Sequence, residues 1–97
     1  MDTYIKLYNW TANLGLTLEE RFVYSLVLHF TEKGIGYFAG TKGMTERLNI
    51  PGKQCRSAIK HLQEIGAVSE SRETIHNQTR KILRANKDFI TKNRQNR

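Results

Sequence analysis

An amphipathic stretch at residues 50–68, IPGKQCRSAIKHLQEIGAV, limits the folds that this chain of 97 residues can adopt. Its apolar residues recur at spacings of three and four, which is the period of a helix with one buried face. The helix is expected to begin near Pro51, whose missing amide hydrogen costs nothing in a first turn, and to stop at Gly66. The chain should therefore build its core around this helix. The expected buried residues are Cys55, Ala58, Ile59, Leu62 and Ile65.

The opposite side of the same helix is polar and largely cationic. It carries ammonium, guanidinium, amide and hydroxyl groups, which phosphates and base edges accept as partners. A DNA-reading helix and an ordinary amphipathic helix with a solvated basic face explain this side equally well. The segments before and after the helix are needed to distinguish the two interpretations. The candidate contact residues are Gly52 at the helix start, then Lys53, Gln54, Arg56, Ser57 and Lys60.

A shorter helix is expected directly before it, over residues 42–48, with Thr41 as its N-cap. Residues 49–51 leave a turn of about three residues between the two helices. A short supporting helix, a tight turn and a longer helix with exposed basic positions make the helix-turn-helix layout, in which the second helix enters the major groove. Lys42 is a further candidate phosphate contact.

The sequence TLEE predicts the start of another helix. The hydroxyl of Thr17 can accept from a backbone amide of the first turn, while Glu20 reaches back to the amide of the cap. The helix should end at residues 32–34 and act as the central scaffold. His29 lies inside its apolar run and is expected to be a hydrogen-bonded core or boundary residue.

The glycine-rich stretch GYFAGTKG superficially suggests a phosphate-binding loop. It lacks the GxxxxGK[ST] order, and no strand and long helix frame it in the required way. A short strand at Tyr37 and Phe38 explains the same residues.

After Gly66 the pattern changes from helical to extended. Residues 67–75 and 79–85 are expected to form a hairpin with a turn at residues 76–78, directly behind the basic helix. A basic hairpin in this position can contact the flanking backbone or minor groove. The alternative is a solvated edge hairpin whose charges discourage strand pairing. Its candidate contact residues are Arg72, Arg80, Lys81 and Arg84.

The charge of the chain is unevenly placed. Residues 1–41 hold three Lys and Arg and four Asp and Glu, whereas residues 42–97 hold thirteen and five. The formal net charge of +7 therefore comes from the back half. A neutral half that supplies much of the core and a basic half that can contact a polyanion are expected of a nucleic-acid binder.

The two ends of the chain complete the expected organisation of one domain over residues 1–90. The aromatic opening with Tyr4, Tyr8 and Trp10 should pack in the core or form a homodimer contact, and stacking on single-stranded nucleic acid is the alternative. Phe89 and Ile90 should return to the body. Residues 91–97 are expected to be a basic, disordered tail.

Nothing in the chain predicts an enzyme, a cofactor or a metal site. The three His residues form no metal motif, the lone Cys55 lies on an apolar stripe, and no acid pair or nucleophile elbow is present. No run approaches a membrane span and no apolar signal core follows the N-terminus, so a cytoplasmic location is predicted.

The order from TLEERFVYSLVLHF through YFAGTKGMTERLNIPGKQCRSAIKHLQEIGAV to the hairpin resembles winged helix-turn-helix domains. It is most similar to the N-terminal domains of phage replisome organisers, DnaD-like primosome proteins and plasmid replication initiators. Residues 16–20, 37–40, 48–50 and 59–68 carry this resemblance.

The resemblance implies an α+β, mostly helical fold with three main helices, a C-terminal hairpin wing and an aromatic N-terminal segment. It implies binding of double-stranded DNA in phage or plasmid replication initiation or transcriptional regulation. The alternatives are a winged-helix module for dimerisation or for docking of replication or transcription proteins, and a single-stranded nucleic-acid binder.

Overall fold

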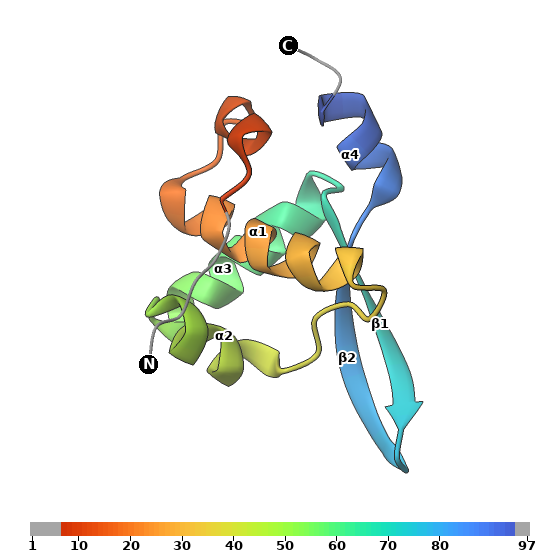
Figure 1. Cartoon of the computed structure of the whole chain (residues 1–97). Helices are drawn as coiled ribbons and strands as arrows, with labels where there is room; N and C mark the ends of the chain where they lie inside the picture. The colour runs from red at the N-terminus through yellow and green to blue at the C-terminus, as the bar shows by residue number, and fades with distance from the viewer. Residues whose placement is uncertain (1–6, 95–97) are drawn as a thin grey trace.

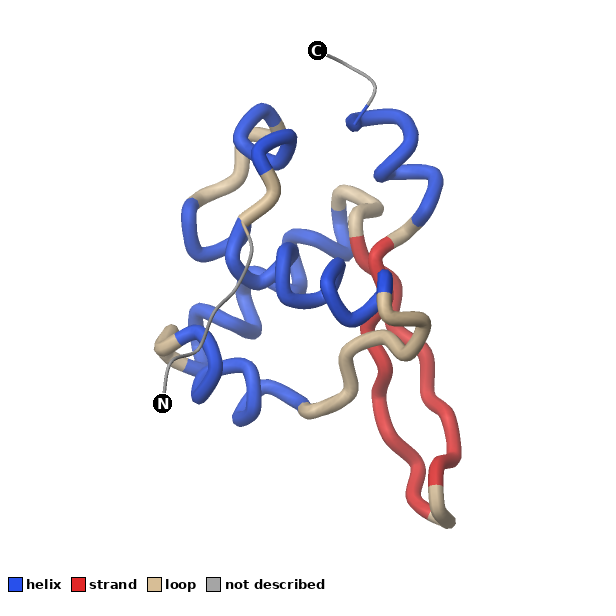
Figure 2. Tube along the Cα trace, viewed as in Figure 1, coloured by secondary structure: helices blue, strands red, loops and turns tan. Residues whose placement is uncertain are grey.

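A computed structural model of the protein describes residues 7–94, which form an α+β, mostly helical fold. The helix α1 crosses the middle of the molecule, and η1 and α4 lie at the end opposite α2 (Figure 1). The two strands form a hairpin that projects away from the helices (Figure 2). No helix within the described range is long and apolar enough to cross a membrane. The elements are η1 (Asn9–Asn13), α1 (Leu18–Glu32), α2 (Gly40–Leu48), α3 (Gly52–Glu64), β1 (Val68–Ile75), β2 (Gln78–Ala85) and α4 (Lys87–Arg94).

The capping box at the start of α1 is confirmed. The Thr17 hydroxyl accepts from the amide of Glu20 at 3.2 Å, and the Glu20 carboxylate accepts from the amide of Thr17 at 2.9 Å. His29 lies at the boundary of the core as expected, where its ring packs edge to face on Phe30. The expected hydrogen bond of His29 is not found among the described residues.

Two predicted helix starts are shifted. The N-cap of α2 is Ala39 rather than Thr41, because Tyr37 is tied to Leu83 by two backbone hydrogen bonds and donates its hydroxyl to the carbonyl of Gly40. Because of these bonds, α2 begins at Gly40, two residues before its predicted start at Lys42. Pro51 is the N-cap of α3 rather than part of its first turn, and the predicted three-residue turn between α2 and α3 is confirmed.

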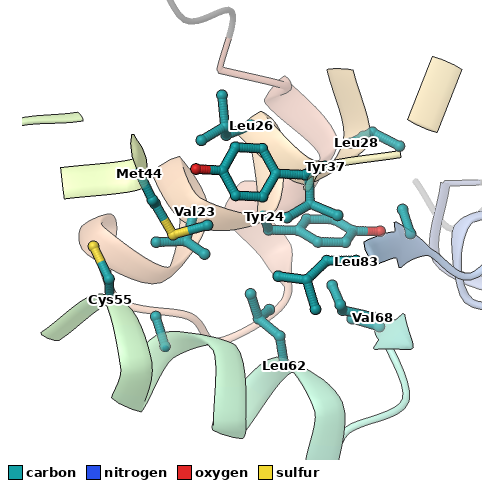
Figure 3. Packing of buried hydrophobic residues seen from close by; sticks show 14 of the residues in the cluster. Val23, Tyr24, Leu26, Leu28, Tyr37, Met44, Cys55, Leu62, Val68 and Leu83 are labelled. Atoms are coloured by element: carbon teal, nitrogen blue, oxygen red, sulfur yellow. The ribbon is translucent and has the colours of Figure 1, made fainter. Parts of the chain in front are cut away.

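The core lies where α1 meets α3 and the base of the hairpin, with Met44 of α2 closing one side (Figure 3). Cys55, Ala58 and Leu62 of α3 are buried as predicted, and Ile59 is partly buried. Ile65 was expected in this stripe but is 37% exposed, because α3 has ended at Glu64. The apolar stripe of α3 is therefore one residue shorter than its sequence period suggests.

The hairpin has a two-residue turn. His76 and Asn77 both have positive φ, which is the requirement of a type I′ turn, and Gln78 already belongs to β2. The strand expected at Tyr37 and Phe38 is reduced to a single bridge between Tyr37 and Leu83. This bridge attaches the segment before α2 to the edge of β2 that does not pair with β1.

The N-terminal segment and α4 pack together over α1. The ring of Tyr24 lies edge to face between those of Trp10 and Phe89, at centroid distances of 5.8 and 6.0 Å. The Tyr8 hydroxyl donates to a carboxylate oxygen of Glu32 at 2.6 Å. Tyr4 lies outside the described residues.

The basic end of the chain differs from the prediction. α4 continues to Arg94, so residues 91–94 are helical rather than a disordered tail. Phe89 and Ile90 pack against the core cluster as expected, and the Asn93 amide donates to the carbonyl of Phe89 at 2.9 Å. The helix therefore extends one turn beyond its apolar anchor. Residues 95–97 lie outside the described part of the chain.

Candidate nucleic-acid interface

The exposed face of α3 divides the predicted contact residues into two sets. Arg56 and Lys60 lie toward the hairpin and line a cavity of about 190 Å³, which Lys81 of β2 also lines. We call it the α3–hairpin cavity. Gln54 and Ser57 lie on the other side, in a depression shared with Glu19 and Glu20 of α1. The structure thus brings three predicted cations together and places two predicted polar contacts beside carboxylates. The residues that line the α3–hairpin cavity are Tyr37, Gly40, Thr41, Arg56, Ile59, Lys60, Gln63, Glu70, Lys81 and Leu83.

The strand register places the four predicted hairpin cations on two opposite faces of the hairpin. Arg72 pairs with Lys81 across the ladder, so both side chains lie on one face. That face is the one turned toward α3, because Lys81 lines the cavity. Arg80 and Arg84 alternate with Lys81 along β2 and lie on the opposite face. Only two of the four hairpin cations therefore share a face with the α3–hairpin cavity.

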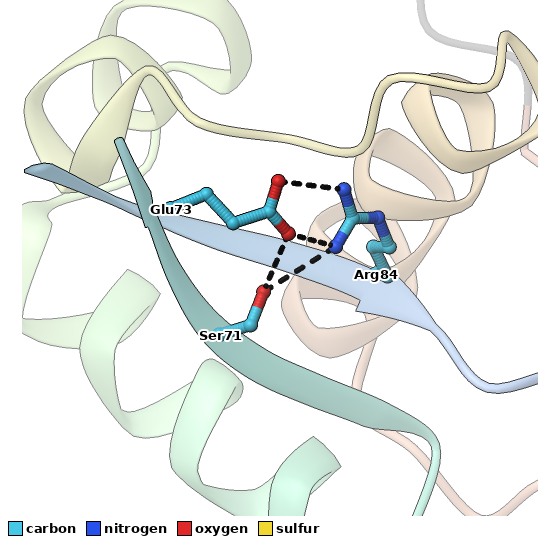
Figure 4. A network of polar contacts seen from close by, with 3 residues as sticks. All are labelled: Ser71, Glu73 and Arg84. Carbon is cyan, nitrogen blue, oxygen red and sulfur yellow. Dashed lines mark hydrogen bonds and ion pairs between the residues drawn. The ribbon is translucent and has the colours of Figure 1, made fainter. Parts of the chain in front are cut away.

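Arg84 is held by its own hairpin. Its guanidinium donates to both carboxylate oxygens of Glu73, at 2.7 and 3.4 Å, and to the Ser71 hydroxyl at 3.3 Å (Figure 4). The hydrogen bond from Arg84 keeps the pKa of the Glu73 carboxyl below its usual range. Much of the Arg84 charge is thus compensated within the chain.

Arg80 also has partners nearby. It donates to the side-chain oxygen of Gln78 at 2.9 Å, and its guanidinium carbon lies 6.0 Å from the centre of the Phe38 ring. The exposed Arg72, by contrast, has no hydrogen bond or ion pair among the described residues.

The starts of α2 and α3 are open to anions. Neither helix has a side-chain cap or an acidic residue in its first turn, whereas α1 has both. Lys42 and Lys53 are exposed in these two first turns. Unsatisfied amides and a positive dipole end favour negative groups such as phosphates. Gly52 has no positive φ, and a Cβ there would make ordinary contacts, the nearest at 3.4 Å from the Arg56 guanidinium.

An ion pair that the sequence does not suggest fixes α3 against α1. Nδ1 of His61 lies 2.8 Å from a carboxylate oxygen of Glu20, the residue that also closes the capping box. Burial tends to raise the pKa of Glu20, but hydrogen bonds from Thr17 and His61 and the His61 charge outweigh it and lower the pKa. The two partners are 41 residues apart, so no local pattern could have paired them.

Two further polar residues line the cavity but were not predicted from the sequence as contact residues. Gln63 lies one helical turn after Lys60, and this spacing was a usable signal for the same face of α3. Glu70 lies two residues before Arg72 and so on the same side of β1, but only the fold brings it next to α3.

Within the described part of the chain, no three His, Cys, Asp or Glu side chains are grouped to hold a metal ion. Comparison with protein-family models, curated proteins and solved structures found no significant match.

Proposed function

We propose that the chain is a winged helix-turn-helix protein that binds double-stranded DNA, with α3 as the reading helix and the β1–β2 hairpin as the wing. The element order supports this proposal. A scaffold helix, an extended segment paired to the last strand, two helices joined by three residues and a hairpin are expected of that fold.

The observation that carries the proposal is the convergence of Arg56, Lys60 and Lys81 on one cavity. They come from two elements that are separate in the sequence, and none of them forms an ion pair among the described residues. Three cations grouped beside the single carboxylate of Glu70 leave an excess of positive charge, so their grouping favours a polyanionic partner. Arg72 and Lys53 extend the same surface along the hairpin and to the start of α3.

In the complex we expect α3 to lie in the major groove with Lys53, Arg56 and Lys60 at phosphates or base edges. Lys81 and Arg72 contact the backbone beside the groove, and Lys42 adds a phosphate contact from the start of α2. Six such contacts correspond to a slope of about −5 in log affinity against log salt concentration. Arg80 and Arg84, on the far face of the hairpin, contribute less.

The test is fluorescence anisotropy of a labelled duplex and the matching single strand, titrated with protein at several salt concentrations. The variant Arg56→Ala/Lys60→Ala/Lys81→Ala removes the cavity cations. The control variant Lys33→Ala/Lys87→Ala/Lys92→Ala removes three exposed cations elsewhere and has the same net charge.

We expect the cavity variant to bind the duplex much more weakly and with a salt slope reduced by about 3, while the control variant stays close to wild type. Equal losses in both variants would mean that only net charge matters. Absence of duplex binding by wild type would refute the proposal.

The role we propose is replication initiation or transcriptional regulation of a phage or plasmid, in the cytoplasm. It rests on the resemblance described above, which is an analogy of fold. An interaction module docked through the aromatic segment is less favoured, because Tyr8 and Trp10 pack against the core cluster of their own chain.

A further inference from the structure

The α3–hairpin cavity has features that phosphate contacts alone do not require. Its floor is apolar and consists of Tyr37, Ile59 and Leu83, all of which belong to the core cluster or pack against it. A phosphate needs donors and positive charge but no apolar floor. Cations above an apolar floor fit a ligand that has both a ring and a phosphate, as a nucleotide does.

A carboxylate lies in the same cavity. Glu70 of β1 accepts a hydrogen bond of 3.4 Å from the side-chain amide of Gln63 on α3, and both residues line the cavity. A carboxylate repels the phosphates that the neighbouring cations attract, so phosphate binding does not explain Glu70. Carboxylates accept hydrogen bonds from the exocyclic amines of bases, and cytosine N4 is the usual partner.

The size of the cavity limits the ring. An engineered apolar cavity of about 150 Å³ holds one benzene molecule. The α3–hairpin cavity, at about 190 Å³, has room for one base ring with its substituents. Among the bases, cytosine carries the exocyclic amine that a carboxylate usually accepts from.

We propose that this cavity binds one unpaired pyrimidine nucleotide of the bound DNA, and cytosine in preference to thymine. The ring lies on the apolar floor, the 4-amino group donates to Glu70, and the adjacent phosphates meet Arg56 and Lys60. Thymine would turn a carbonyl oxygen toward the carboxylate and is disfavoured. The proposal rests on the proposed DNA binding, and it identifies the preferred target as DNA with an unpaired base.

A base that is already unpaired suits such a pocket best. Extruding a paired base from a duplex requires several hydrogen bonds and stacking contacts to be broken, and a mismatched or bulged base avoids most of this penalty. The protein should therefore bind a duplex with a single bulged dC more tightly than the same duplex without the bulge.

The experiment measures anisotropy at one salt concentration on three duplexes: fully paired, with one bulged dC, and with one bulged dT. We expect roughly tenfold tighter binding of the dC bulge than of the paired duplex, and at least about fivefold tighter binding than of the dT bulge. Glu70→Gln should abolish the preference for dC over dT, because an amide can donate to the thymine carbonyl. Glu64→Gln removes a carboxylate of α3 outside the cavity and should keep the preference.

The outcomes separate this inference from the proposed function. Equal binding of all three duplexes would overturn the pocket and leave DNA binding standing. Loss of the preference in both variants would assign it to net charge and also overturn the pocket. If wild type binds no duplex, the proposed function fails, and titration with dCMP followed by NMR decides on the pocket. Unchanged signals of the Gln63 side-chain amide and the Leu83 methyl groups would then overturn it.

Discussion

Replacing Glu20 should loosen the joint between α1 and α3. Glu20 has two roles, because its carboxylate accepts from the amide of Thr17 and pairs with the ring of His61. Each role is worth about 0.5–1 kcal/mol, since the capping bond is exposed and the His61 side chain is 41% exposed. Glu20→Ala should therefore lower the free energy of unfolding by about 1–2 kcal/mol, a fall of roughly 4–15 °C in Tm for a domain of this size.

Glu20→Gln separates the two roles, because glutamine also closes a capping box but carries no charge. It should lower the free energy of unfolding by only about 0.5–1 kcal/mol. In a double-mutant cycle, His61→Ala should then have a smaller effect in the Glu20→Ala background than in wild type. The measurement is urea and thermal unfolding followed by circular dichroism.

The pH dependence of this stability follows from the lowered pKa of Glu20. A carboxyl whose folded pKa lies below its ordinary value of 4.5 stabilises the fold above that value and stops doing so as the pH falls through the folded pKa. The difference between wild type and Glu20→Gln should be present above about pH 4.5 and should shrink as the pH falls below it. The reasoning is refuted if Glu20→Ala is no less stable than Glu20→Gln, or if the effects of Glu20→Ala and His61→Ala add in full.

Three other substitutions test separate parts of the structure. The buried hydroxyl of Tyr24 has no hydrogen-bond partner among the described residues, so Tyr24→Phe should raise the free energy of unfolding by about 1 kcal/mol; a lower Tm would indicate a partner. Gly36 has φ of 85°, and a Cβ there would lie 2.7 Å from a side-chain carbon of β2, so Gly36→Ala should destabilise by about 2–4 kcal/mol in urea unfolding. Gly52→Ala, its control, should be neutral or stabilising. Glu73→Ala should free Arg84 and tighten duplex binding roughly two- to fivefold in anisotropy titrations, whereas weaker binding would mean that the pair orders the hairpin for DNA.

Local signals in the sequence predicted the helices well where neighbouring residues determine them. The capping box at Thr17 and Glu20 involves atoms three residues apart, so the start of α1 could be read from four letters. The start of α2 could not, because it depends on the pairing of Tyr37 with Leu83 on a strand far downstream. No helix was predicted at α4, where Phe89 and Ile90 anchor a helix whose last turn, residues 91–94, is entirely polar.

The candidate contact residues were predicted as residue types, but their grouping was not. Strand alternation could have separated Lys81 from Arg84, since they lie three positions apart on β2. Nothing in the order of residues indicates that Arg84 is held by Glu73, or that Glu70 enters the cavity beside Arg56. These contacts depend on the register of the hairpin and on its packing against α3.

The most direct test of the central claim is NMR mapping of the backbone amides during titration with a short DNA duplex. If α3 and the inner face of the hairpin form the interface, the largest shifts should fall on residues 52–63, on Arg72 and Lys81, and at the start of α2. The amides of η1 and α4, at the far end of the molecule, should change little. Large shifts confined to η1 and α4, with α3 unaffected, would contradict the assignment of α3 as the reading helix.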